Sequence, residues 1–127
     1  MNSKKALHTV PVPSTEFVEE AFWDGRGPRP TIRFAYVQRG VQVQGGIEFR
    51  NVSAMRKRAE RCCTAWHLEG AYDTLLEIID STWLSEILAD TSAHWRSKWE
   101  MHHFMIYLDS VGCFEIIAES WAATQQS

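Results

Sequence analysis

Two apolar runs joined by a short polar turn near the C-terminus constrain the fold of this chain most. The runs HHFMIYL and CFEIIA flank residues 109–112, whose types suit a type I turn with glycine in the left-handed position of a bulge. We therefore predict a β-hairpin over residues 104–121. If Asp109 lies opposite Cys113, one face is uniformly apolar and should face the core: Phe104, Ile106, Leu108, Phe114, Ile116 and Ala118.

The same register places a histidine beside a carboxylate at the open end of the hairpin. His103 would face Glu119, within hydrogen-bond reach. Such a pair can perform acid–base chemistry, or it can end the strand as a simple polar contact. Together with His67, these two residues are the candidate catalytic groups. The chain shows no accompanying nucleophile motif or phosphate loop, so no reaction is identified.

Alternation with a period of two predicts further strands upstream. It runs through residues 31–44, and Gly45-Gly46 is expected to form a turn into another strand that starts at Ile47. Residues 75–79 are apolar on both faces, as a central strand or a buried helix segment would be.

Two other segments fit either a helix or a strand. Residues 14–23 suit a short helix or an extended edge segment. Residues 53–66 carry a helical stripe of apolar side chains, but a strand that enters at Ile47 could also continue through them. Both alternatives stay open for each segment.

A helix of about two to three turns is expected in the segment TWLSEILAD. Trp83 and Ile87 form one apolar i,i+4 pair, and Leu84 and Leu88 form another. The preceding residues 80–82 are all of types that cap helix N-termini.

These patterns predict an α+β fold with a single domain. An antiparallel sheet would carry one or two short helices, with the helix around residues 83–88 covering one face. The chain has 127 residues, which is enough for one core. Residues 1–13, with two prolines, are expected to be a flexible arm, residues 14–122 the domain, and residues 123–127 a flexible tail.

Composition excludes several classes of function. The formal net charge of −3 argues against nucleic-acid binding through phosphate attraction. No apolar run approaches the ~18 residues of a membrane span, and no signal peptide is evident. Three cysteines, two of them adjacent, favour a reducing compartment, so we expect a cytoplasmic protein. The cysteine and histidine spacing matches no zinc pattern, and we expect no metal and no cofactor.

Two of the six tryptophans lie in a polar setting. Trp95 and Trp99 occur in SAHWRSKWE with basic residues between them. An exposed aromatic pair of this kind is typical of a binding hot spot. A loop that folds back to cap the sheet is the alternative. Trp95, Trp99 and the nearby His102 are the candidate binding residues.

The segments IEFRNVSAMRKRAE, AYDTLLEIIDSTWLSEI and HHFMIYLDSVGCFEIIAESW together resemble a group of small bacterial proteins without assigned function. In that group an F-x-x-V segment, a mid-chain strand and a closing H-F-x-I-Y-x-D…F-E-V-I-A hairpin occur in this order. The resemblance covers residues 30–121 and implies a compact domain dominated by its sheet, which favours a strand at residues 47–60. It assigns no catalytic residues.

The expected function is therefore a non-enzymatic protein-interaction module, with immunity-type binding as one form of it. Its partner would be another protein or a second copy in a homodimer. The alternative is a small ligand-binding protein or hydrolase with a pocket formed around His103 and Glu119.

Overall fold

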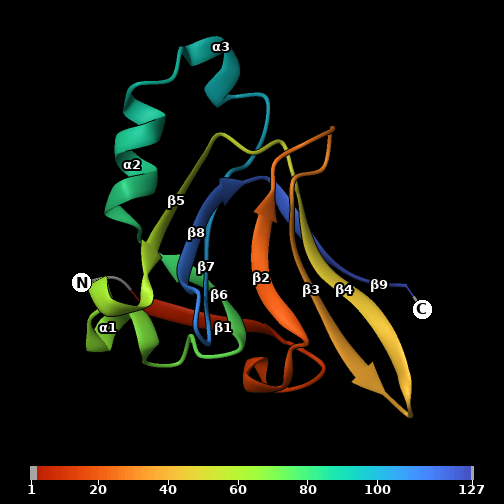
Figure 1. The fold of residues 1–127 in the computed structure, drawn as a ribbon. Coiled ribbons are helices and arrows are strands. Elements are labelled where there is room, and N and C mark those ends of the chain that lie inside the picture. The colour runs from red at the N-terminus through yellow and green to blue at the C-terminus, as the bar shows by residue number, and fades with distance from the viewer. Residues whose placement is uncertain (1–2, 127) are drawn as a thin grey trace.

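Two antiparallel sheets form the frame of the molecule, and a computed structural model describes them over residues 3–126 (Figure 1). The larger sheet has the order β1 (Ser3–Thr9), β6 (Thr74–Ile79), β7 (His102–Leu108), β8 (Gly112–Ala118) and β5 (Ala54–Ala59). The smaller sheet has the order β2 (Glu19–Asp24), β3 (Thr31–Gln38), β4 (Val41–Arg50) and β9 (Ser120–Gln126).

Short helical segments connect the strands. These are η1 (Ser14–Glu16), η2 (Glu60–Cys62), α1 (Ala65–Leu68), α2 (Thr82–Ala89) and α3 (Ala93–Arg96). The α+β class is the one expected from the sequence. Within residues 3–126, no helix has both the length and the hydropathy needed to cross a membrane.

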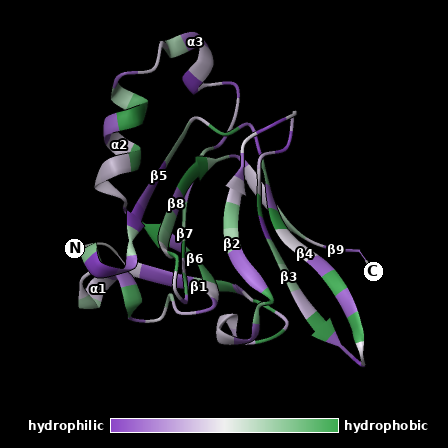
Figure 2. Ribbon diagram, viewed as in Figure 1, coloured by the Kyte–Doolittle hydropathy of each residue, from purple (hydrophilic) through white to green (hydrophobic). Residues whose placement is uncertain are grey.

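The main core lies between the two sheets. Residues on β3 and β4 alternate between hydrophobic and hydrophilic (Figure 2), and their apolar side chains meet those of β7 and β8. The predicted apolar face of the hairpin is confirmed, because all six of its residues belong to this core. The largest fully buried members from the smaller sheet are Tyr36, Phe49, Ile32 and Ile47.

A second, smaller core covers the opposite face of the larger sheet. It contains Met105, Tyr107 and Cys113 of the hairpin, with Trp66 and Leu68 of α1 packed against them. The inner face of this sheet is thus covered by the other sheet, and not by α2 as expected. Helix α2 instead contacts β7 and projects away from the sheets with α3 (Figure 1).

The predicted hairpin forms from β7 and β8, but it ends at Ala118 and not at Trp121, which belongs to β9 of the smaller sheet, and its register also differs. His103 lies opposite Ile117, not Glu119. The Leu108 carbonyl accepts a hydrogen bond from the Val111 N–H, so the turn begins one residue earlier than expected. The shift amounts to two residues along the partner strand, which leaves each side chain on its predicted face.

The turn contains two residues with left-handed backbone, Ser110 (φ 66°) and Gly112 (φ 118°). Glycine is required at the second of these positions for space as well as for conformation. A Cβ at Gly112 would collide with the carbonyl oxygen of Arg58 on the neighbouring strand β5.

The expected turn at Gly45-Gly46 is wrong. The chain turns at Arg39 and Gly40, which both have positive φ, and the two later glycines lie inside β4. Gly45 faces Phe34 across the pair, and a Cβ there would lie 2.5 Å from a ring carbon of Phe34. Glycine at this position therefore makes room for an aromatic ring in the core.

The structure shows which form each ambiguous segment takes. Residues 54–59 form strand β5, and the following residues turn into η2 and α1. Residues 14–23 form a single turn, η1, and then the edge strand β2. Residues 75–79 belong to strand β6. Helix α2 is confirmed, and Ser81 is its N-cap.

Residues 1–13 and 123–127 were expected to be a flexible arm and a flexible tail, but most of them lie in paired strands. Residues 3–9 form β1, which pairs with β6, and Val10 is buried in the main core. Residues 123–126 belong to β9, which pairs with β4. Residues 1, 2 and 127 lie outside the described part of the chain.

Candidate functional site

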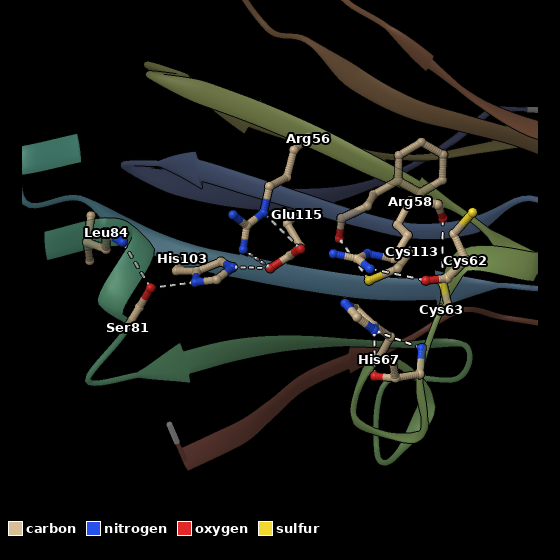
Figure 3. Close-up of polar contacts among 12 residues, drawn as sticks. Arg56, Arg58, Cys62, Cys63, His67, Ser81, Leu84, His103, Cys113 and Glu115 are labelled. Atoms are coloured by element: carbon tan, nitrogen blue, oxygen red, sulfur yellow. Dashed lines mark hydrogen bonds and ion pairs between the residues drawn. The ribbon is translucent and has the colours of Figure 1, made fainter. Parts of the chain in front are cut away.

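A chain of polar contacts crosses the outer face of the larger sheet and involves one of the predicted histidines. His103 is only 2% exposed. Its Nδ1 lies 2.6 Å from Ser81 Oγ, and its Nε2 donates to Glu115 Oε1 over 2.8 Å (Figure 3). Ser81 precedes α2 and Glu115 lies in β8, so His103 links a helix start to the sheet.

Arg56 of β5 extends this chain of contacts. Its guanidinium donates to both carboxylate oxygens of Glu115, with Nε–Oε2 at 3.0 Å and Nη2–Oε1 at 3.1 Å. The same guanidinium lies over the Trp83 ring, 3.9 Å from the ring centroid. Trp83 in turn meets the His103 ring edge-on. Both sides of the buried carboxylate are therefore satisfied.

The ionisation of Glu115 reflects these partners. Burial raises the pKa of Glu115, but the hydrogen bonds from His103 and Arg56 outweigh burial and lower its pKa to about 2. Glu115 is therefore a carboxylate at neutral pH, which a buried position tolerates only because two donors face it.

A serine, a histidine and a carboxylate joined by hydrogen bonds are the groups that an enzyme with a serine nucleophile uses. Here all three side chains are buried. Ser81 is 4% exposed, and its Oγ already accepts the Leu84 N–H as the cap of α2. A substrate carbonyl would have to reach an atom that is both buried and committed to a helix end. The arrangement therefore fixes α2 on the sheet.

The other predicted catalytic residues have separate partners. Glu119 accepts a hydrogen bond from Asn51 Nδ2 over 2.8 Å. His67 is buried, and its Nδ1 accepts the Thr64 N–H at the start of α1 (Figure 3). Burial lowers the pKa of His67. The expected contact between His103 and Glu119 is therefore wrong, and His103 bonds Glu115 instead.

The sequence reasoning did not identify Glu115 as the partner of His103, although the sequence indicates that Glu115 needs a partner. It is the one charged residue in the apolar run CFEIIA, and a charge in a buried strand needs a partner. The register that was expected placed Tyr107 opposite it and so concealed its contact with His103.

The cysteines occupy three different environments. Cys62 is exposed, Cys63 is partly buried, and Cys113 is buried in the smaller core. Burial raises the pKa of the Cys113 thiol to about 12. Among residues 3–126, no group of three or more His, Cys, Asp or Glu side chains is placed to hold a metal ion.

The candidate binding tryptophans lie together at the outer end of the helical projection. The rings of Trp95 and Trp99 stack with centroids 5.6 Å apart and planes 17° apart. Lys98 Nζ lies over both rings, at 4.9 Å and 5.4 Å from their centroids. Trp95 is 48% exposed. His102, the third candidate, lies apart from this pair and bonds Glu77 Oε2 over 2.6 Å.

Residues 82–99, here called the α2–α3 arm, carry apolar side chains besides Trp95 and Trp99. These side chains are not part of either hydrophobic core. No residue of α2 or α3 is buried, and none of the arm's side chains belongs to either hydrophobic core. The partly exposed ones on α2 are Trp83, Leu84, Ile87 and Leu88. Trp83 packs on His103 and Arg56, and the arm therefore presents apolar side chains that belong to neither core.

A groove of about 520 Å³ on the smaller sheet is lined by three arginines. Two of them, Arg26 and Arg33, donate to the buried carboxylate of Asp24. These hydrogen bonds hold the pKa of Asp24 well below its usual range. Arg29 faces Glu48 at 3.4 Å. Because carboxylates of the protein already pair with these arginines, we do not assign the groove as an anion-binding site. The contacts instead hold the loop between β2 and β3 against the smaller sheet.

A comparison of the chain with protein-family models, curated proteins and solved structures found no match. The resemblance to small bacterial proteins therefore stays a prediction, and function must be inferred from the site alone.

Proposed function

We propose that this protein is a non-enzymatic interaction module that binds another protein through the α2–α3 arm. The partner segment would combine acidic side chains with an apolar one.

The stacked pair of Trp95 and Trp99 outside both cores carries this proposal. A large aromatic side chain at the surface costs solvation free energy unless something covers it. Tryptophan is also among the residues most enriched in binding hot spots, where it fills a pocket of the partner. The lysine above both rings further orders the pair, so little conformational entropy remains to be lost on binding.

The charges next to the two tryptophans, at the α3 end of the arm, indicate the chemistry of the partner, whereas the acidic residues of the arm, Glu86 and Asp90, belong to α2 and its C-cap. Lys98 lies over both rings and the His94 ring contacts Trp95, while Arg96 follows Trp95 in the sequence. The molecule as a whole carries a net charge of −3. A local basic patch on an acidic protein favours a partner with carboxylates at this surface. The apolar residues of α2 would contact the remainder of the same segment.

A random-peptide display library tests this proposal. We expect selection on the immobilised protein to yield acidic peptides with an apolar residue. Trp95→Ala and Lys98→Glu should each weaken their binding at least tenfold. Phe22→Ala is the matched control, because Phe22 is an aromatic residue with 50% exposure on β2, away from the arm. Its peptide affinity should equal that of the wild type.

Three outcomes would overturn the proposal. The library could yield no binder that depends on Trp95. Phe22→Ala could reduce binding as much as Trp95→Ala does. A single-stranded oligonucleotide, tested in parallel, could bind the arm in place of the peptides, since aromatic and basic groups together also suit nucleic acid.

A further inference from the structure

The two sheets have four edge strands within residues 3–126, and three of them carry charged residues. Strand β5 has Arg56, Lys57 and Arg58, and β1 has Lys4 and Lys5. Strand β2 has three acidic residues: Glu19, Glu20 and Asp24. The pairing of β1 and of β2 is also irregular. Charges and bulges are the usual means by which proteins stop an edge strand from pairing with another chain.

Strand β9 has none of these features. Its sequence, SWAATQQ, contains no charged residue and no proline. It pairs with β4 at seven consecutive positions without a shift in register, so its free edge is regular as well. Residues 122–126 are all exposed. Figure 1 shows β9 at the outer side of the smaller sheet.

We propose that β9 is a homodimer interface at which two copies pair antiparallel, edge to edge. The two four-stranded sheets would then form one continuous sheet around a two-fold axis. This surface is separate from the α2–α3 arm, so the proposal does not depend on the arm binding a partner.

The sequence of β9 suits a second copy of itself. An antiparallel pair centred on Ala123 places this residue opposite its own copy and Ala122 opposite Thr124. Trp121 would face Gln125 on the side of the sheet that meets the core. Small residues at the centre allow close approach, and no like charges face each other in an uncharged strand.

An apolar hollow beside β9 supports the same interface. A concavity of about 300 Å³ is lined by Pro11, Phe34 and Ala123, among others, and Gln125 also lines it. In the proposed register, Trp121 of the second copy lies opposite Gln125. The partner would therefore cover apolar surface in addition to forming strand hydrogen bonds.

The test uses light scattering coupled to size-exclusion chromatography. We expect the wild-type protein to show twice the 14.6 kDa chain mass at micromolar concentration. Ala123→Lys and Ala123→Glu should each give the single-chain mass, because like charges then face each other on the two-fold axis. An equimolar mixture of the two variants should recover the doubled mass, since lysine then faces glutamate.

Ala6→Lys on β1 is the matched control, because Ala6 is also an exposed alanine on an edge strand. It should stay dimeric, and far-ultraviolet circular dichroism should show that every variant is folded. A wild type that is monomeric at all concentrations would overturn the proposal. So would single Ala123 variants that remain dimeric, or a mixture of them that fails to associate.

Discussion

His103 and Glu115 lie diagonally across the β7–β8 hairpin, and they are joined by a 2.8 Å hydrogen bond that is almost closed to solvent. His103 also bonds Ser81, the N-cap of α2, and so ties the start of the α2–α3 arm, which carries Trp95 and Trp99, to the sheet.

The stability of the protein should depend on pH through Glu115. Its pKa in the folded protein, about 2, lies below its ordinary value of 4.5. The carboxylate therefore stabilises the fold above pH ~4.5, and this contribution is lost as the pH falls towards 2. Because Arg56 is half exposed and screened by solvent, we expect a loss on the order of 2 kcal/mol.

Urea unfolding at pH 7 and at pH 3 measures this effect. The free energy of unfolding should fall more between these pH values in the wild type than in Glu115→Gln, which cannot titrate. Equal pH dependence in the two proteins would contradict the assignment.

Removal of the Ser81 hydroxyl should destabilise the fold by about 1–2 kcal/mol. Ser81→Ala deletes the cap of α2 and leaves His103 Nδ1 without its partner. Ser92→Ala is the matched control, because Ser92 precedes α3 without a side-chain capping bond. Its free energy of unfolding should change by less than about 0.5 kcal/mol. Equal losses for the two serines would show that the contact with His103 contributes nothing.

Gly45→Ala should destabilise the fold by about 1–3 kcal/mol, because the new methyl group would meet the Phe34 ring. In a double-mutant cycle, Phe34→Leu should relieve part of this loss. The double variant would then be more stable than the sum of the single changes predicts. Strict additivity would show that the two residues do not contact each other.

Trp95→Ala should leave the free energy of unfolding within about 0.5 kcal/mol of the wild type, because Trp95 is outside both cores. Phe104→Ala, which empties a buried position, should cost about 3–5 kcal/mol. Thermal or urea unfolding compares the two variants. A large loss for Trp95→Ala would mean that the arm is part of the folding core.

Much of the hairpin could be predicted because the alternation of side chains determines which face is apolar. The register could not be predicted, since it depends on a left-handed serine, Ser110, that has no distinctive sequence signal. That one difference moved the partner of His103 from Glu119 to Glu115. Helix α2 was predictable because its cap and its apolar pairs are local features.

The two-sheet arrangement depends on contacts between distant residues, and this explains why it was missed. Nothing within residues 3–9 shows that they pair with β6, about seventy residues later. Gly45-Gly46 reads as a turn because the space those glycines create for Phe34 appears only after β3 and β4 are paired. Alternating patterns identify strands, but they do not identify which strands are neighbours.

The indole N–H signals of the six tryptophans give the most direct test of the proposed binding surface. They can be followed in a nitrogen–proton NMR spectrum while an acidic peptide selected from the display library is added. We expect the signals of Trp95 and Trp99 to shift, and those of Trp23 and Trp66 to stay in place. Unchanged Trp95 and Trp99 signals at saturating peptide would contradict the assignment of the α2–α3 arm as the interaction surface.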